Sequence, residues 1–157
     1  MARIAVMTAA ICVATILSIP FGNGYIHLAD ALCMLAGIYL GPLFGALAAA
    51  LGSSLSDLLL GYVPYIPATF IIKGLVALIV GIFYNKTRKN KFFVIPSAIL
   101  SEALMVLGYF LYEALIYANF ASALFGVWGN AVQAISSVII FVFVILIYEK
   151  KKKNKRQ

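Results

Sequence analysis

The chain has 157 residues, of which 64% are hydrophobic and only 11% are charged. A soluble domain is about half apolar, so a water-soluble globular protein is excluded and lipid is the expected solvent. The formal net charge of +7 comes mostly from two segments, 86–91 and 150–156. That distribution is typical of loops beside a membrane and not of a nucleic-acid-binding face.

Apolar runs along the chain predict six helices, because a membrane-spanning helix needs about 20 apolar residues. The first is ended by Pro20, and the second is short because Gly41-Pro42 interrupts it. The expected ranges are 3–20, 28–40, 42–60, 66–84, 92–117 and 125–148. We therefore predict an all-α integral membrane protein with six transmembrane helices in a single domain, 1–149, followed by a basic cytoplasmic tail, 150–157.

The positions of the basic residues predict the orientation. The connections 21–27, 61–65 and 118–124 contain no Lys or Arg. By the positive-inside rule these connections lie outside, and both termini are cytoplasmic. A re-entrant pair formed by the second and third helices remains an alternative. Removal of residues 1–22 as a signal peptide would place the basic segments on opposite sides, so we expect no cleavage.

Polar side chains within the predicted helices gather in the outer half of the bilayer, if each residue adds about 1.5 Å of rise. Those at this depth are Asp57, Lys73, Tyr109, Glu113, Asn130 and Gln133. Spacings of three and four residues place the members from one helix on one face. Only Glu102 is expected deep on the inner side.

Two interpretations of these polar residues remain open. Charged groups inside a membrane are costly and commonly functional, which favours an outward-opening pocket for a small polar molecule. The alternative is a structural network in which Asp57 pairs with Lys73. Trp128, Tyr109 and Tyr112 could supply flat surfaces for a ring, or could belong to an interfacial aromatic belt.

The connection FGNGYIH, residues 21–27, is predicted to be a loop at the mouth of this pocket. Its glycines allow backbone shapes that other residues avoid. Asn23 and His27 add hydrogen-bonding groups. The loop is therefore either a lid over the pocket or a plain turn.

Several kinds of chemistry find no support in the sequence. Cys12 and Cys33 lie in apolar runs without a CxxC or a nearby His, and His27 is the single histidine, so no metal site and no cofactor are expected. The chain contains no GxxxxGK[ST] phosphate loop and no HExxH motif, so ATP hydrolysis or protease chemistry by this chain is not expected. We therefore predict that it is not an enzyme.

The stretch GIYLGPLFGALAAALGSSLSDLL, followed by P-x-T-F-I-I-K-G at 67–74, resembles the S components of energy-coupling factor (ECF) vitamin importers. The similarity covers residues 3–148 and is strongest with the riboflavin, hydroxymethylpyrimidine and pyridoxine binders. The resemblance implies a six-helix, multi-pass protein of the bacterial plasma membrane that binds a vitamin from outside. It implies a pocket made by the fourth to sixth helices and the outer loops, the region that the depth estimate also indicates. We therefore predict a substrate-binding set of Asn23, Lys73, Tyr109, Glu113, Trp128, Asn130 and Gln133.

The resemblance also implies partners. These are a transmembrane coupling subunit and two cytoplasmic ATPase subunits, and the coupling subunit would contact small residues of the first helix, here Ala5 and Ala9. The many polar groups favour a small ring such as pyridoxine or hydroxymethylpyrimidine as the ligand, with riboflavin as the alternative. A stand-alone carrier or channel and a small membrane enzyme are the competing functions.

Overall fold

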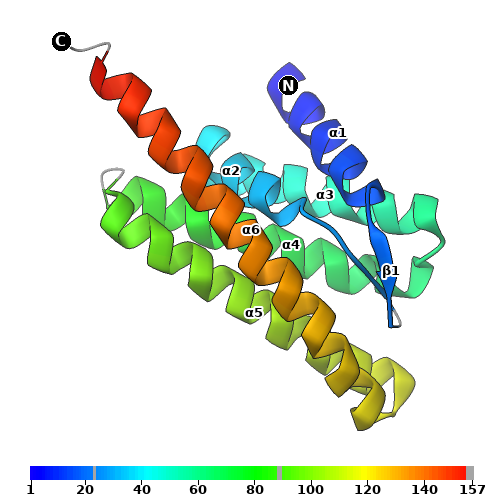
Figure 1. Cartoon of the computed structure of the whole chain (residues 1–157). Coiled ribbons are helices and arrows are strands. Elements are labelled where there is room, and N and C mark those ends of the chain that lie inside the picture. Colours follow the sequence, from blue (N-terminus) through cyan, green and yellow to red (C-terminus); the bar gives the residue numbers. More distant parts are fainter. Residues whose placement is uncertain (23, 88–89, 155–157) are drawn as a thin grey trace.

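The computed structural model describes residues 1–22, 24–87 and 90–154, and within them the chain forms six α-helices and one β-hairpin (Figure 1). Most of the chain is helical, as the apolar runs predict. The elements are α1 (Ala2–Ile16), β1 (Ile19–Phe21), β2 (Gly24–Ile26), α2 (Asp30–Tyr39), α3 (Pro42–Leu60), the short 3₁₀ helix η1 (Val63–Tyr65), α4 (Ile66–Lys86), α5 (Lys91–Tyr117) and α6 (Phe120–Asn154).

Four helices have the length and composition to cross a bilayer, and they confirm the prediction of a multi-pass membrane protein. They are α3, the segment Val63–Lys86 that contains α4, and the apolar parts of α5 and α6. The helices α1 and α2 are apolar but shorter, with 15 and 10 residues. Many large apolar side chains on the outer faces of the helices are exposed, as expected where lipid is the solvent.

The predicted break between the second and third helices is confirmed at Gly41-Pro42. Gly41 has φ +85°, a left-handed conformation that favours glycine, and Pro42 opens α3 at a position where the missing N–H costs nothing. The chain therefore reverses sharply between α2 and α3.

The short helix α2 lies inside the bundle, against α3, α4 and α6. Eight of its ten residues are buried. Close approach depends on glycine: a Cβ at Gly37 would collide with the Ala77 carbonyl on α4, and one at Gly45 would collide with the α2 backbone. This packing carries the first turn of α2, with Asp30, into the interior.

The segment 19–26 differs from the prediction. Instead of a first helix reaching residue 20 and a loop, α1 ends at Ile16, and β1 and β2 form an antiparallel hairpin with Ile19 opposite Ile26 and Phe21 opposite Gly24. Pro20 ends no helix but lies in β1, opposite Tyr25. Hairpin pairing satisfies backbone groups that a loop would leave to water.

The last helix also begins earlier than predicted. The connection expected at 118–124 is reduced to Ala118 and Asn119, because Asn119 accepts a hydrogen bond from the Ser122 backbone N–H (3.1 Å) and so caps α6 at its start. Ala118 takes a left-handed φ of +47° at the end of α5. Two long helices thus pack side by side along the molecule (Figure 1).

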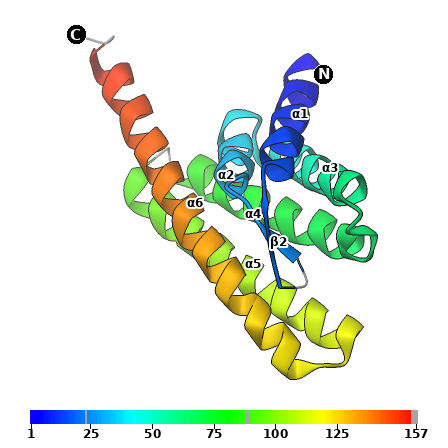
Figure 2. The same cartoon turned by 45° about the vertical axis from the view of Figure 1, so that its right-hand side comes forward.

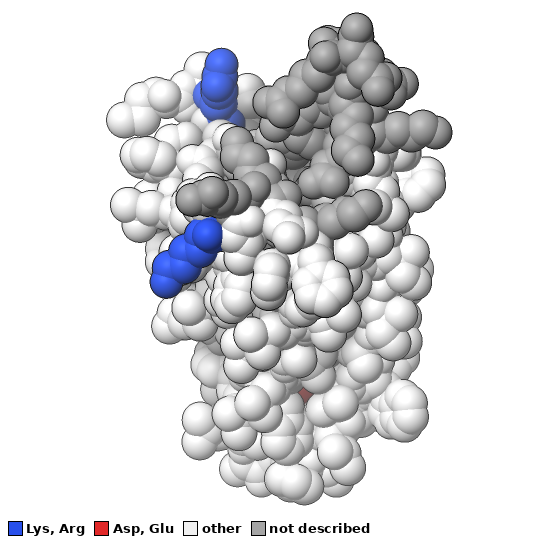
Figure 3. Space-filling model, turned by 90° about the vertical axis from the view of Figure 1, so that its left-hand side faces the viewer, with Lys and Arg blue, Asp and Glu red and all other residues white. Residues whose placement is uncertain are grey.

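The two ends of the chain lie at the same end of the molecule. In Figures 1 and 2, α1 begins and α6 finishes at the top, whereas the β1–β2 hairpin and the α5–α6 turn point away from it. Figure 3 shows one face on which the visible Lys and Arg side chains cluster toward that same end, above a surface that is almost free of charge. The asymmetry agrees with the distribution of basic residues along the sequence.

Candidate ligand-binding site

A small polar cavity lies between the hairpin and the helix bundle, with a volume of about 40 Å³. Residues from β2, from η1 and its flanks, and from α3 to α6 converge on it. They are Gly24, Tyr25, His27, Asp57, Tyr62, Tyr65, Thr69, Lys73, Tyr109, Glu113, Asn130 and Gln133. A space of this size holds one or two water molecules, whereas ligand pockets are about 300–1,000 Å³, so the cavity is too small for a vitamin as it stands.

A buried ionic network forms the floor of the cavity. Lys73 Nζ donates to both carboxylate oxygens of Asp30, at 2.7 and 2.8 Å, and the two side chains are 1% and 0% exposed. Gln133 Nε2 donates to Asp30 Oδ2 (2.7 Å), while its Oε1 accepts from the His27 backbone N–H (3.0 Å). The network therefore joins α2, α4, α6 and the hairpin, and each charge in it is satisfied.

The predicted pairing of Asp57 with Lys73 is corrected by this network. Lys73 is bound to Asp30, and Asp57 instead accepts a hydrogen bond from the Tyr25 hydroxyl of the hairpin. The packing of α2 against α4 places Asp30 next to Lys73. Asp57 lies beside the hairpin, where the Tyr25 hydroxyl is its donor.

Tyrosines form most of one wall of the cavity. The ring centroids of Tyr25 and Tyr62 are 4.8 Å apart, those of Tyr62 and Tyr65 are 6.2 Å apart, and those of Tyr65 and Tyr109 are 6.5 Å apart. Lys73 Nζ lies 5.2 Å from the centroid of the Tyr109 ring, within cation–π range. The wall can stack on a flat ring and offers hydroxyl groups at its edges.

Glu113 faces this wall from α5. Its Oε1 accepts a hydrogen bond from the Tyr65 hydroxyl (3.2 Å), and the side chain is buried. A Cβ at Gly126 of α6 would collide with Glu113 Oε2, so the glycine leaves the room that the carboxylate occupies. Glu113, the tyrosine wall and the Lys73–Asp30 ion pair therefore lie around one small cavity.

The hairpin supplies two groups whose ionisation is suppressed. Burial, together with the positive charge of Lys73, lowers the pKa of His27 to about 3. His27 Nδ1 accepts a hydrogen bond from the Ala29 backbone N–H (3.1 Å), which also requires a neutral ring. Burial, and then the negative charge of Asp57, raises the pKa of Tyr25 far above its usual value. Both residues are therefore neutral hydrogen-bonding groups.

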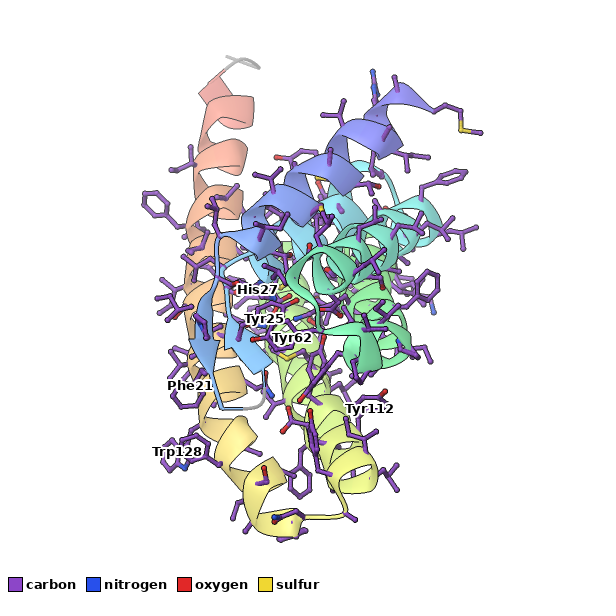
Figure 4. All side chains as sticks on the ribbon, turned by 90° about the vertical axis from the view of Figure 1, so that its right-hand side faces the viewer. Phe21, Tyr25, His27, Tyr62, Tyr112 and Trp128 are labelled. Atoms are coloured by element: carbon purple, nitrogen blue, oxygen red, sulfur yellow. The ribbon has the colours of Figure 1, made fainter. Side chains whose placement is uncertain are left out.

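Five of the residues predicted to bind substrate line the cavity. These are Lys73, Tyr109, Glu113, Asn130 and Gln133. Trp128 does not line it: the side chain is 71% exposed and lies on the outer side of α6, away from Tyr25, His27 and Tyr62 (Figure 4). Asn23 lies outside the described residues.

The other residues that the sequence singled out have varied positions. Tyr112 donates to the Pro64 carbonyl beside the cavity. Glu102 is buried, and neither of its carboxylate oxygens has a hydrogen-bond partner among the described residues. Ala5 and Ala9 lie on the exposed face of α1, opposite Ile11, which packs on α3 near Gly52.

Asp30, Tyr25 and Tyr65 were missed by the sequence interpretation. Asp30 begins α2, and an acid at a helix start is commonly a surface residue that favours the helix dipole. The sequence did offer one signal: Asp30 lies within an otherwise apolar segment. A charged residue inside a membrane protein usually pairs with a group of opposite charge. Lys73 also needed a counter-charge, and Asp57 was only one of two candidates.

These features define the class of the protein: an integral membrane protein of apolar helices with a polar, aromatic-walled cavity between them. The chain belongs to the ECF-type riboflavin transporter S component family, whose family model matches residues 1–150. It is thus a substrate-binding subunit of an ECF transporter. Such a subunit is not an enzyme, and it works in a complex with membrane and ATPase partners.

The chain is also similar to an uncharacterized relative and to one solved structure. The chain is 34% identical over 122 residues to an uncharacterized protein of Pyrococcus woesei, covering 78% of this chain and 80% of that protein. Its fold is similar to that of a solved structure titled "Structure and mechanism of the S component of a bacterial ECF transporter", with a TM-score of 0.75. That match covers 99% of this chain and 96% of the other at 18% identity, so it shows the shared fold alone.

Proposed function

We propose that this S component captures a small vitamin, or a vitamin precursor, in the cavity beneath the β1–β2 hairpin. The observation that carries the proposal is the convergence of Lys73, Tyr109, Glu113, Asn130 and Gln133 from three helices onto one enclosed space. Polar groups buried in a membrane protein are costly, and here they are concentrated around a single cavity. Asn23, predicted from the sequence, is proposed as an additional contact.

The character of the cavity favours a single-ring ligand with hydroxyl or amino groups, such as pyridoxine or hydroxymethylpyrimidine. Its walls carry ionic, amide and phenolic groups, whereas the three fused rings of a flavin need a large and mostly apolar surface. Riboflavin is the second candidate, because the family whose model matches the chain is described by that vitamin.

Entry of any of these ligands requires the site to open. A space of about 40 Å³ is several times smaller than a vitamin-sized pocket. Within the described residues the hairpin and His27 after it make few polar contacts with the rest of the chain. Tyr25 bonds to Asp57, the Tyr62 hydroxyl donates to the Gly24 carbonyl (3.3 Å), and the His27 N–H donates to Gln133. We infer that these contacts break when the hairpin moves aside.

The orientation proposed from the sequence is supported by the common position of the chain ends in Figures 1 and 2. Both termini and the segment 86–91 would be cytoplasmic, and the hairpin would face outward. In this arrangement all six helices belong to the membrane domain, with α1 and α2 crossing only part of the bilayer thickness by their own length, about 1.5 Å per residue.

The proposed partners are a transmembrane coupling subunit and two cytoplasmic ATPase subunits. Ala5 and Ala9 are one turn apart on the exposed face of α1, where small side chains let another helix approach closely. Release of the ligand to the inside would then be driven by ATP hydrolysis in the partner subunits.

Calorimetric titration of the purified protein in detergent with pyridoxine, hydroxymethylpyrimidine and riboflavin tests the proposal. We expect one site per chain and tight binding of a single-ring ligand. Glu113→Ala and Asn130→Ala should weaken it at least about tenfold, because each removes a buried polar contact. Ser136→Ala on α6, whose hydroxyl bonds only to the Val132 carbonyl of its own helix in the described structure, is the control. Unchanged affinity in both site variants would exclude this cavity.

A further inference from the structure

Two carboxylates at the cavity each have one oxygen in use and one oxygen free. Tyr25 donates to Asp57 Oδ1, and Tyr65 donates to Glu113 Oε1. The second oxygens, Asp57 Oδ2 and Glu113 Oε2, are buried and make no hydrogen bond within the described part of the chain. Buried acceptors without a donor are costly, so these oxygens point to a donor that arrives from elsewhere.

The described residues at the cavity and its ion pair include more acidic groups than basic ones. Lys73 is held by both oxygens of Asp30, so this pair is neutral as a whole. His27 is uncharged, because its Nδ1 accepts from the Ala29 N–H. Among the described residues that line the cavity, Asp57 and Glu113 are therefore left without a cation of their own.

Glu113 is the stronger of the two acceptors for a ligand. Thr69 lies close enough to Asp57 to interact with it, and Thr69 itself receives a hydrogen bond from the Tyr109 hydroxyl (3.0 Å). Glu113 Oε2 instead lies against Gly126 of α6, in the room that the absent glycine side chain leaves, and it has no donor among the described residues. Glu113 also lines the cavity, so a rotation of its side chain would bring this oxygen to a ligand there.

We propose, on the basis of the proposed function, that Glu113 makes this site selective. The site would prefer a ring that bears an amino group, neutral or protonated, over the same ring bearing a hydroxyl group. The free Oε2 accepts the N–H of the ligand, and the uncompensated acids at the cavity attract its positive charge. A hydrogen bond to a charged partner is about twice as strong as a neutral one. The aromatic wall holds the ring and Glu113 determines which substituent it prefers.

Matched ligand pairs test this selectivity. Wild-type protein is titrated with pyridoxamine and pyridoxine, and with 4-amino- and 4-hydroxy-5-hydroxymethyl-2-methylpyrimidine, so that members of a pair differ at one group. We expect the amino member of the bound pair to have at least about tenfold higher affinity. Glu113→Gln should reduce this ratio to near one, because the amide lacks the charge that strengthens a hydrogen bond from an amino group.

Glu102→Gln is the control, because Glu102 is a second buried acid on α5 that does not line this cavity. It should keep the wild-type ratio. If Glu113→Gln fails to fold by thermal unfolding, Glu113→Asp, which retains the charge but withdraws it by one methylene, should lower the ratio partially.

The outcomes separate this inference from the proposed function. Equal affinities within the bound pair, a ratio unaffected by Glu113→Gln, or binding of riboflavin alone would overturn the selectivity and leave vitamin capture standing. Binding of neither pair nor of riboflavin would overturn both.

Discussion

Lys73 and Asp30 form a bidentate ion pair across 43 positions of sequence, with both side chains almost fully removed from solvent. One partner belongs to α4 and the other to the first turn of α2, so the pair fastens the short inner helix to a long one. Removal of one partner leaves a buried charge uncompensated, which costs about 3–5 kcal/mol.

Lys73→Met and Asp30→Asn should therefore each lower the midpoint of thermal unfolding, measured without ligand in detergent, by roughly 6–20 °C. The double variant Lys73→Met/Asp30→Asn should be more stable than either single variant, since no charge is left unpaired. Additive losses in the double variant would show that the two side chains act independently.

Gly37→Ala should destabilise the protein, because the new Cβ would overlap the Ala77 carbonyl and force α2 away from α4. Gly74→Ala is the matched control on α4: its Cβ would meet Ala50 at an ordinary 3.5 Å. Alanine is favoured over glycine in a helix by about 1 kcal/mol, so the control should be neutral or slightly stabilised. Thermal unfolding of the two variants compares them, and equal melting temperatures would contradict the close approach.

His27 should make stability depend on pH. Its pKa is about 3 in the fold against 6.5 when unfolded, so between these values only the unfolded chain binds the proton. The stabilisation is complete above pH 6.5 and is lost as the pH falls toward 3, with a slope of up to about 1.4 kcal/mol per pH unit. Unfolding midpoints measured from pH 7 to pH 4 should fall less steeply in His27→Asn, whose amide oxygen can still accept from Ala29. Parallel profiles would show that His27 is not the titrating group.

Ala9→Trp should abolish ATP-dependent vitamin uptake while leaving ligand affinity unchanged, since the large side chain would block a partner helix at the exposed face of α1 and lies far from the cavity. Leu58→Trp, at an exposed apolar position of α3, is the control and should transport normally. Uptake in proteoliposomes with the ATPase partners and calorimetry on the isolated subunit give the two readouts. Normal uptake by Ala9→Trp would remove α1 as the docking helix.

Trp128→Phe should leave ligand affinity within about twofold of wild type. The indole is 71% exposed and does not line the cavity, so its removal changes no described polar contact of the site. Calorimetric titration measures the effect. A loss of tenfold or more would mean that the hairpin and α6 rearrange on binding to bring Trp128 to the ligand.

The sequence predicted the helical class, the break at Gly41-Pro42 and five of the cavity residues, because each depends on local chemistry. Apolar runs of spanning length, a proline after a glycine, and polar groups at three- and four-residue spacing have the same meaning in any membrane protein. It failed where two local preferences compete. Pro20 was interpreted as the end of a helix, whereas the strand pairing of Pro20 with Tyr25 decided that segment.

By itself, the sequence determined that this chain is a membrane protein with a limited set of buried polar groups. Composition and periodicity are properties of the chain alone and do not depend on which segments pack together. Which acid neutralises Lys73 was decided only by the tertiary structure. Asp30 and Asp57 are both possible partners along the chain, and the choice follows from glycine-mediated packing of α2 against α4, a contact between distant segments that no local pattern specifies.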